Sequence, residues 1–352
     1  MYKNKKVLIS GHTGFKGSWL TIWLLRLGAD VTGYALNPKT QRNNFVLCGL
    51  ENLIKDYRED IRNFNKLNEV LGKVKPEIIF HLAAQPLVIE SYHNPHYTIE
   101  TNTQGTANIL EAFRQSDSAK VLIVITTDKV YKNNEWERGY KETDILGGVD
   151  PYSASKSAAE LLVTAYQKSF FCDNNKLLVS VRAGNVIGGG DWAENRIIPD
   201  CMKAIERNEK IIIRNPNSTR PWQHVLEPLG GYMLLGEKLL LRNSELIGAW
   251  NFGPLMSNVI NVEDLVKHFI QAFGRGEYSI ANVSNARAET NFLSLDITKA
   301  IKKLNWNPLL NIDETIDLTV DWYKNYNSLN LFDLCNRQIE QYEQKWKLKK
   351  EN

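Results

Sequence analysis

The segment that decides the fold reads VLISGHTGFKGSWLTIWLLRLG and spans residues 7–28. It opens with a short apolar run, which predicts a buried strand, and continues from residue 18 to residue 27 as an apolar helical pattern closed by Gly28. Between the two lie Gly11, Gly14 and Gly17. Glycines at such a turn allow a tight bend and a close approach to a pyrophosphate, which the helix N-terminus favours. The segment therefore predicts the start of a βαβ unit that binds a dinucleotide.

The turn after the second expected strand, residues 30–34, leaves the choice of dinucleotide open. The acidic residue that usually binds the ribose is missing there, because the chain continues ALNPK. Asn37 can bind a ribose hydroxyl, although more weakly than a carboxylate. Lys39 and Arg42 are cations that can accommodate the 2′-phosphate of NADP. The residues alone are therefore compatible with NAD and with NADP.

Strands and helices alternate through the first half of the chain. We expect a short strand just before Asp60, and further strands at residues 78–85, 121–125 and 177–182. Helices are expected at 63–72, about 95–115 and 153–171. This rhythm predicts the α/β class with a doubly wound parallel sheet of the Rossmann type. Ligands bind at the carboxyl ends of such strands, where the pattern places Gly11, Ala83 and Thr127.

The rhythm breaks after residue 184, where a segment rich in glycine, proline and tryptophan follows. We therefore predict a dinucleotide-binding domain over residues 1–184 and a smaller mixed α/β substrate domain over most of 185–352. Helical patterns at 228–241 and 262–273 lie in this second part. Residues 225–252 are expected to return to the first domain. Arginines among aromatic residues at 214–225 can clamp a diphosphate and stack a base.

Composition excludes several classes of protein. The net charge of +3 is too small to indicate nucleic acid or a membrane surface as partner, and no apolar run approaches the ~20 residues of a membrane span. The four cysteines are scattered without a Cys-x-x-Cys pair, and His93 and His96 lie in a proline-broken loop without a third ligand nearby. We expect a metal-free cytoplasmic protein without a secretory signal.

Three residues suggest proton removal from an alcohol. Tyr152 and Lys156 are four apart behind a possible N-cap, Asp150, so they share one face of a helix. Thr127 ends an apolar strand and can hydrogen-bond the same substrate oxygen. Free tyrosine has a pKa near 10 and is a poor base at neutral pH, but a nearby ammonium favours the phenolate. A Tyr-x-x-x-Lys pair alone is common, so its weight depends on the dinucleotide turn upstream.

Together these motifs resemble the extended short-chain dehydrogenase/reductase family over nearly the whole chain. Within it, Asp128 and Lys129 directly after Thr127 are similar to the pair of sugar-nucleotide 4,6-dehydratases, and the turn GHTGFKGSWL most resembles the branch acting on CDP-glucose. The resemblance implies NAD as cofactor and CDP-glucose as substrate. It implies cofactor contacts from Gly11, Thr13, Gly14, Phe15, Lys16, Gly17, Asn37, Asp60, Ile61, Leu82, Ala83, Ala84, Gln85, Asn102, Thr126, Tyr152 and Lys156. Substrate contacts are expected from Asn185, Asp191, Arg196, Arg214, Arg220, Trp222 and His224.

The reaction implied is a lyase reaction without net oxidation. Tyr152 takes the proton of the 4-hydroxyl while hydride leaves C4; the 4-ketone acidifies H5; water is lost across C5 and C6; and hydride returns to C6. Asp128 is the expected acid for the 6-hydroxyl. Lys129 is either the base, if it is neutral, or a cation that stabilises the enolate.

Alternatives remain at this point. They are a nucleotide-sugar 4-epimerase of the same fold, a 4,6-dehydratase for another nucleotide sugar, and a non-catalytic dinucleotide sensor. A homodimer or homotetramer built on the helices near 95–115 and 153–171 is expected from the resemblance, as is a place in making deoxysugars for the O-antigen of lipopolysaccharide.

Overall fold

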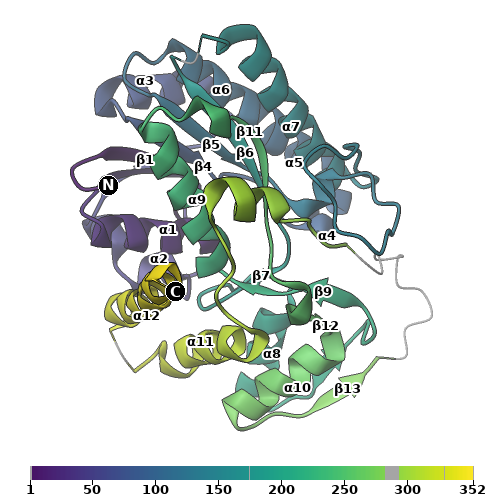
Figure 1. Ribbon diagram of the computed structural model, residues 1–352. Helices are drawn as coiled ribbons and strands as arrows, with labels where there is room; N and C mark the ends of the chain where they lie inside the picture. The colour runs from purple at the N-terminus through teal and green to yellow at the C-terminus, as the bar shows by residue number, and fades with distance from the viewer. Residues whose placement is uncertain (1, 174, 282–292, 329, 352) are drawn as a thin grey trace.

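The computed structural model describes residues 2–173, 175–281, 293–328 and 330–351. Its centre is one sheet of seven parallel strands in the order β11-β6-β5-β4-β1-β2-β3 (Figure 1). The strands are β1 (Lys6–Ser10), β2 (Asp30–Ala35), β3 (Lys55–Arg58), β4 (Ile78–His81), β5 (Val121–Ile125), β6 (Leu177–Ala183) and β11 (Gly248–Phe252). The order reverses between β1 and β4, so the expected doubly wound sheet is confirmed, and its ligand-binding crevice lies at that switch.

Both faces of the sheet are covered, which explains why its central strands read as continuous apolar runs. On β1, Val7 and Ile9 pack into one core with α1 and α9, while Leu8 packs into the other with α3 and α6. The helices of the first face are α1 (Phe15–Arg26) and α9 (Leu226–Leu240), with α12 (Leu331–Glu351) packed outside α1. Those of the second are α3 (Phe64–Val74), α6 (Gly105–Gln115) and α7 (Pro151–Phe170).

The chain leaves the sheet after β6 and returns to it through α9 and β11. β11 pairs with β6 in parallel, with Trp250 opposite Val181. Trp250 and Phe252 are fully buried, so this returning strand belongs to the main core. A right-handed crossover from β6 to β11 would need only a helix; here the crossover also carries the start of a second, smaller lobe.

The smaller lobe lies at the carboxyl edge of the sheet, in the lower part of Figure 1. It contains three two-stranded pairs: β7 (Val186–Ile187) with β10 (Gln223–His224), β9 (Thr219–Pro221) with β12 (Val259–Asn261), and β8 (Ile211–Ile213) with β13 (Tyr278–Ile280). Its helices are α8 (Ile197–Glu206), α10 (Val262–Phe273) and α11 (Ile312–Asn325). The helix expected at 262–273 has these bounds.

Short elements complete the chain. They are α2 (Asn44–Leu47), η1 (Leu50–Asn52), α4 (Val88–His93), α5 (Pro95–Ile99), the π-helical turn η2 (Glu100–Gln104), η3 (Asp128–Val130), η4 (Ser244–Leu246), η5 (Met256–Asn258) and the π-helical turn η6 (Ala300–Leu304).

The strand expected at 78–85 ends four residues earlier, at His81. Leu82 N still donates to Ser10 O at 2.9 Å, but backbone N–H groups beyond it bind side chains. Ala83 N donates to Ser10 Oγ at 3.3 Å, and Gln85 N donates to Asn102 Oδ1 at 2.8 Å. Hydrogen bonds to side chains thus replace strand pairing, and the strand ends beside the glycine turn.

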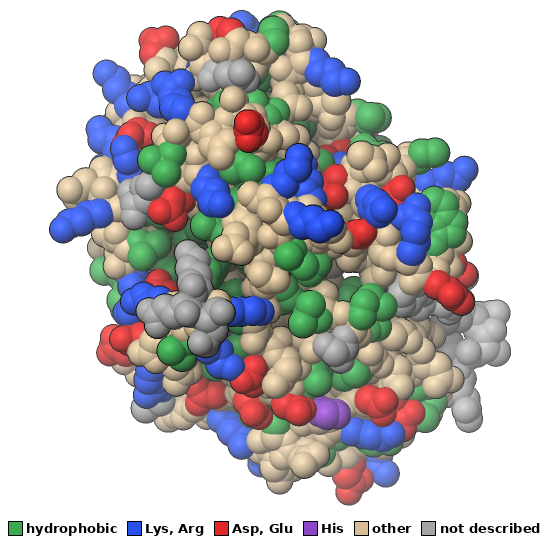
Figure 2. Space-filling model, viewed as in Figure 1, with side chains coloured by type: hydrophobic (Ala, Val, Ile, Leu, Met, Phe, Trp, Pro, Cys, Tyr) green, Lys and Arg blue, Asp and Glu red, His purple; other side chains and the backbone are tan. Residues whose placement is uncertain are grey.

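The visible surface mixes charges of both signs, with Lys and Arg interspersed among Asp and Glu in Figure 2. Across the parts of the chain that are described, no helix combines the length and apolar character needed to cross a membrane.

Candidate active site

The glycine turn between β1 and α1 leaves bare backbone at the switch point of the sheet. Gly11 has φ +79°, and a Cβ there would lie 2.6 Å from Ala83 N. A Cβ on Gly17 would lie 2.1 Å from Gly11 O. Only glycine fits at these two positions. The first turn of α1 carries no acidic residue, so its N-terminus can face an anion. The turn therefore fits the pyrophosphate of a dinucleotide.

The loop after β2 contains Asn37 and leads to Arg42, one of the two cations that could bind the 2′-phosphate of NADP. Asn37 is exposed, and Thr13 Oγ1 donates to Leu36 O at 3.0 Å, which ties this loop to the glycine turn. The guanidinium of Arg42, in contrast, pairs with Glu206 and lies 3.6 Å from the ring centroid of Trp192. Arg42 is thus bound to the smaller lobe.

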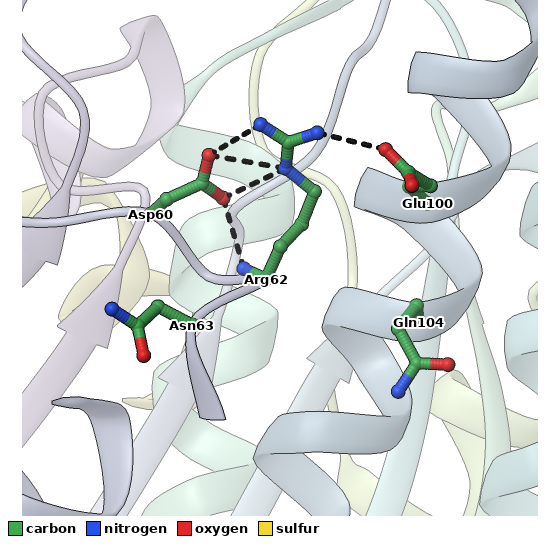
Figure 3. Close-up of a pocket in the computed structure, with 5 residues that line it drawn as sticks. All are labelled: Asp60, Arg62, Asn63, Glu100 and Gln104. Carbon is green, nitrogen blue, oxygen red and sulfur yellow. Dashed lines mark hydrogen bonds and ion pairs between the residues drawn. The ribbon is translucent and has the colours of Figure 1, made fainter. Parts of the chain in front are cut away.

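A pocket of about 380 Å³ opens at the far end of the crevice, lined by Asp60, Arg62, Asn63, Glu100 and Gln104 (Figure 3). Arg62 bridges it, donating to Asp60 Oδ2 and to Glu100 Oε2, both at 2.8 Å. Burial acts to raise the pKa of Asp60, but the hydrogen bonds from Arg62 outweigh it and hold that pKa below its usual value. The carboxylate expected to contact cofactor is therefore ionised and already paired.

Asn102 connects the loop after β4 to the helix that carries Tyr152. Its Oδ1 accepts from Gln85 N, and its Nδ2 donates to Gln85 O at 3.1 Å and to Ser155 Oγ at 2.9 Å. The expected cofactor residues Gln85 and Asn102 therefore lie together and hold the first turn of α7.

Thr127 and Asp128 lie at the carboxyl end of β5, buried at its junction with η3. Thr127 Oγ1 donates to Asp128 Oδ1 at 2.9 Å and accepts from Lys129 N at 3.4 Å. A Cβ on Gly184 would lie 2.9 Å from Asp128 Oδ2. Absence of a side chain at residue 184 thus makes room for the Asp128 carboxylate.

Tyr152 and Lys156 face the same volume from α7. Asp150 caps this helix, since its side chain accepts from Ser153 N at 2.9 Å, and Pro151 occupies the first turn. Burial raises the pKa of Tyr152 to about 12, opposed by a hydrogen bond with Thr127. Burial lowers the pKa of Lys156 to about 8, and its Nζ donates to Ile125 O at 2.9 Å. Thr127 therefore meets Tyr152, and Lys156 lies one turn further along the same helix, against the end of β5.

Two further cations approach this group. Burial lowers the pKa of Lys16 to about 8; the charge of Arg196 lowers it further, and that of Asp128 opposes. Arg196 begins α8 and donates to Asp191 Oδ2 at 2.7 Å. Its charge also favours ionisation of Tyr152. Arg196 and Asp191 from the smaller lobe thus lie close to the residues expected to be catalytic.

The other expected substrate residues are spread more widely. Asn185 accepts from Gln223 N through its backbone at 3.0 Å, and Arg214 contacts Asn195 at 3.2 Å. Arg220 lies on β9. The remaining two are not brought to the crevice. Trp222 is buried and donates to Ile260 O at 3.3 Å. His224 is fully buried against Trp19, and this burial lowers the pKa of His224 to about 3.

Metal binding finds no support in the described parts of the chain, where no group of three His, Cys, Asp or Glu side chains could hold an ion. Sequence analysis did not identify one buried acidic residue at the site, Glu160. Glu160 lies one turn beyond Lys156 and pairs with Arg182 behind the catalytic residues. Its spacing of four from Lys156 was visible, but its partners on β5 and β6 were not.

Known sugar-nucleotide dehydratases are similar to this chain in sequence. A family model described as GDP-mannose 4,6 dehydratase matches residues 8–319. CDP-glucose 4,6-dehydratase of Salmonella typhimurium is 44% identical over 328 residues, covering 92% of this chain and 91% of that protein. The chain belongs to this dehydratase family. Its place among the extended short-chain dehydrogenases/reductases is thereby confirmed.

Another sequence relative and two solved structures are similar to this chain at lower identity. CDP-paratose 2-epimerase of Salmonella typhi is 28% identical over 90% of this chain and 98% of that protein. The solved dTDP-glucose 4,6-dehydratase of Streptomyces venezuelae, with NAD and TYD bound, superposes with a TM-score of 0.79 at 22% identity, covering 91% and 97% of the two chains. UDP-glucose 4-epimerase of Thermotoga maritima, with UDP-glucose, gives 0.78 at 22%, covering 92% and 100%. These structures support the Rossmann architecture.

Proposed function

We propose that this protein converts CDP-D-glucose to CDP-4-dehydro-6-deoxy-D-glucose with bound NAD⁺. The observation that carries the proposal is the placement of Asp128 and Lys129. They directly follow Thr127 at the end of β5, and the buried Asp128 carboxylate acts electrostatically on Tyr152. The relative at 44% identity, a CDP-glucose 4,6-dehydratase, supports the choice of substrate.

The first step is removal of the 4-hydroxyl proton by Tyr152. Its pKa, raised to about 12 by burial, must fall for this role. Lys156, with a pKa of about 8, is mostly protonated at pH 7, and it lies four residues further along the same helix. Its ammonium can therefore favour the phenolate. The glycine turn of Gly11, Gly14 and Gly17 would hold NAD⁺, which would supply the hydride acceptor for C4 and the hydride donor for C6.

The second step is loss of water across C5 and C6. The 4-ketone acidifies H5, and a base next to C5 must remove it while an acid protonates the 6-hydroxyl. Asp128 is buried and accepts from Thr127 Oγ1, and it is the acid that we propose for the 6-hydroxyl. Lys129 is partly buried beside it. It acts as the base if it is neutral; otherwise its charge stabilises the enolate.

The structure favours NAD over NADP for a specific reason. Arg42, which the sequence left available for a 2′-phosphate, pairs with Glu206 and stacks on Trp192. We expect a higher kcat/KM with NAD⁺, and Arg42→Ala should leave that preference unchanged. A higher kcat/KM with NADP⁺ that Arg42→Ala lowers selectively would return Arg42 to the cofactor site.

The product assay tests the proposal. The protein would be incubated with NAD⁺ and either CDP-glucose or dTDP-glucose, and the products identified by NMR. We expect 4-keto-6-deoxy product from the CDP-sugar. A 4-epimer without loss of water would identify an epimerase instead. Preference for the dTDP-sugar would retain the reaction and change the substrate.

We also infer that the protein assembles as a homodimer. Leu161 on α7 is 61% exposed and continues an exposed stripe of small residues formed by Ala154 and Ala165, while Ile99 on α5 is 51% exposed nearby on the bundle. Two copies of these helices would bury the stripe. Light scattering should give twice the monomer mass, and Leu161→Glu should reduce it to the monomer. A wild-type monomer would contradict the inference.

The cell compartment proposed is the cytoplasm. All four cysteines are free thiols, and Cys172 is exposed, as suits a reducing environment.

The proposed product carries a 4-keto group, which later reduction or amino transfer in deoxysugar synthesis can use. We propose that the resulting sugar enters the O-antigen of lipopolysaccharide. Deletion of the gene should shorten or alter the O-antigen if this destination is right.

A further inference from the structure

A buried ion pair lies directly behind the catalytic residues. Glu160 of α7 is 1% exposed and Arg182 of β6 is 3% exposed. Glu160 Oε1 accepts from Arg182 Nε at 2.9 Å, and Oε2 accepts from Arg182 Nη2 at 2.8 Å. Such a fork is the most directional pairing that arginine and carboxylate can form. These hydrogen bonds join the two side chains to each other, and neither residue has a role in the reaction described above.

The carboxylate also holds the chain just before the catalytic residues. Thr126 Oγ1 donates to Glu160 Oε1 at 2.5 Å, and Ser180 Oγ donates to Oε2 at 2.7 Å. Each carboxylate oxygen therefore accepts two hydrogen bonds and has no remaining capacity. Thr126 immediately precedes Thr127, so Glu160 anchors the end of β5 next to the catalytic threonine.

The guanidinium holds the chain just after them. Arg182 Nη1 donates to Tyr131 OH at 2.7 Å, and Tyr131 OH donates to Asn251 Oδ1 at 2.7 Å. Tyr131 closes η3. Residues 127–129 therefore lie between two anchors, Thr126 and Tyr131, that are both bound to one ion pair.

The same pair also fixes the other half of the site. Tyr152, Lys156 and Glu160 are spaced by four residues, so they share one face of α7. Lys156 Nζ also reaches the end of β5, at Ile125 O, but Glu160 joins both Thr126, directly after β5, and Arg182 on β6. Glu160 therefore helps to set the distance between that face and η3. We propose that Glu160 and Arg182 are positioning residues that hold Asp128 and Lys129 in register with Tyr152 and Lys156 for dehydration.

This inference rests on the proposed function, because it takes the roles of residues 127–129 from it. It predicts a specific separation of steps. Tyr131 anchors the far end of η3, two residues beyond Lys129, whereas Tyr152 lies in the capped first turn of α7 and meets Thr127 at the near end of η3. Loss of the Tyr131 hydroxyl should therefore disturb elimination more than oxidation at C4. A misplacement of about 1 Å can cost on the order of 10²-fold in rate.

The experiment compares three variants in single turnovers with CDP-glucose and NAD⁺ in deuterated water, following NADH absorbance and deuterium at C5. Tyr131→Phe keeps the ring stacked on Tyr140, so it should fold normally. We expect NADH to form at nearly the wild-type rate and to persist, while elimination slows by at least ~10-fold. Glu160→Gln should slow both steps, because it releases both anchors.

Glu227→Gln is the matched control. Glu227 is an equally buried carboxylate that accepts from Leu309 N and Leu310 N and from Tyr342 OH, away from η3. It should lower stability without separating the two steps. Equal slowing of both steps in Tyr131→Phe, or wild-type rates in folded Glu160→Gln, would overturn the positioning role. If the wild type itself releases no dehydrated product, the proposed function fails first, and the two failures are thereby distinguished.

Discussion

The two ends of the crevice hold their charges in different ways. At the catalytic end, Arg182 and Glu160 form a pair whose side chains are 4% and 1% exposed. At the cofactor end, Arg62 and Asp60 form a similar pair, but with 36% and 26% of each side chain exposed. Water screens the second pair and cannot reach the first. Loss of the buried ion pair should therefore change both rate and stability, whereas loss of the exposed ion pair should have little effect on either.

The catalytic end should show the largest effect on activity when Tyr152 loses its hydroxyl. Tyr152→Phe removes the base and should reduce kcat by about 10²–10⁴-fold. Steady-state turnover of CDP-glucose measures this, with circular dichroism to verify folding. Near-normal turnover in a folded variant would place the base on another residue.

The buried pair should show the largest effect on stability. Arg182→Met leaves Glu160 without its partner and should cost about 3–5 kcal/mol at neutral pH. Denaturant unfolding measures the loss. A cost below ~1 kcal/mol would show that the pair behaves like a surface one.

The sign of the pH dependence sharpens the same prediction. Burial alone would raise the pKa of Glu160, but Arg182 outweighs burial and holds it below its usual 4.5. In the wild type, this stabilisation is present above pH 4.5 and is lost as the pH falls through the lower, folded-state pKa. In Arg182→Met, burial should raise the pKa of Glu160 instead, so protonation of Glu160 should reduce the destabilisation of the variant. The stability gap between the two proteins should therefore narrow towards acid pH. A gap that stays constant would contradict the assignment.

The exposed pair at the cofactor end should give the smallest effect. Arg62→Ala should change unfolding free energy by no more than about 1 kcal/mol and leave kcat at saturating NAD⁺ unchanged. Thermal unfolding and steady-state kinetics check both. A loss as large as that of Arg182→Met would remove the contrast between the two ends.

Sequence patterns predicted the features that depend on local order. The glycine turn, the cap at Asp150 and the helix at 262–273 were all expected, because each is encoded by neighbouring residues. The strand at 78–85 was expected too long, since its true end at His81 depends on Asn102 and Ser10 from elsewhere in the chain.

The remaining features depend on the order of strands in the sheet. Glu160 and Arg182 meet only because β6 lies beside β5 under α7, which no local pattern encodes. The same holds for Arg42, whose partner Glu206 lies in the smaller lobe. His224 lies in a segment whose arginines and aromatic residues predicted ligand binding, but its place on β10 buries it against Trp19 of α1. The expected roles of individual site residues stay predictions until they are tested by substitution.

We propose that Asp128 and Lys129 eliminate water after Tyr152 has initiated oxidation at C4. One measurement tests it most directly: the NADH absorbance of Asp128→Asn during a single turnover of CDP-glucose with NAD⁺, with the product analysed at the end. Because an amide is a far weaker acid than a carboxyl group, NADH should form at close to the wild-type rate and persist, with little 6-deoxy product. Release of 4-keto-6-deoxy product at the wild-type rate would contradict the account.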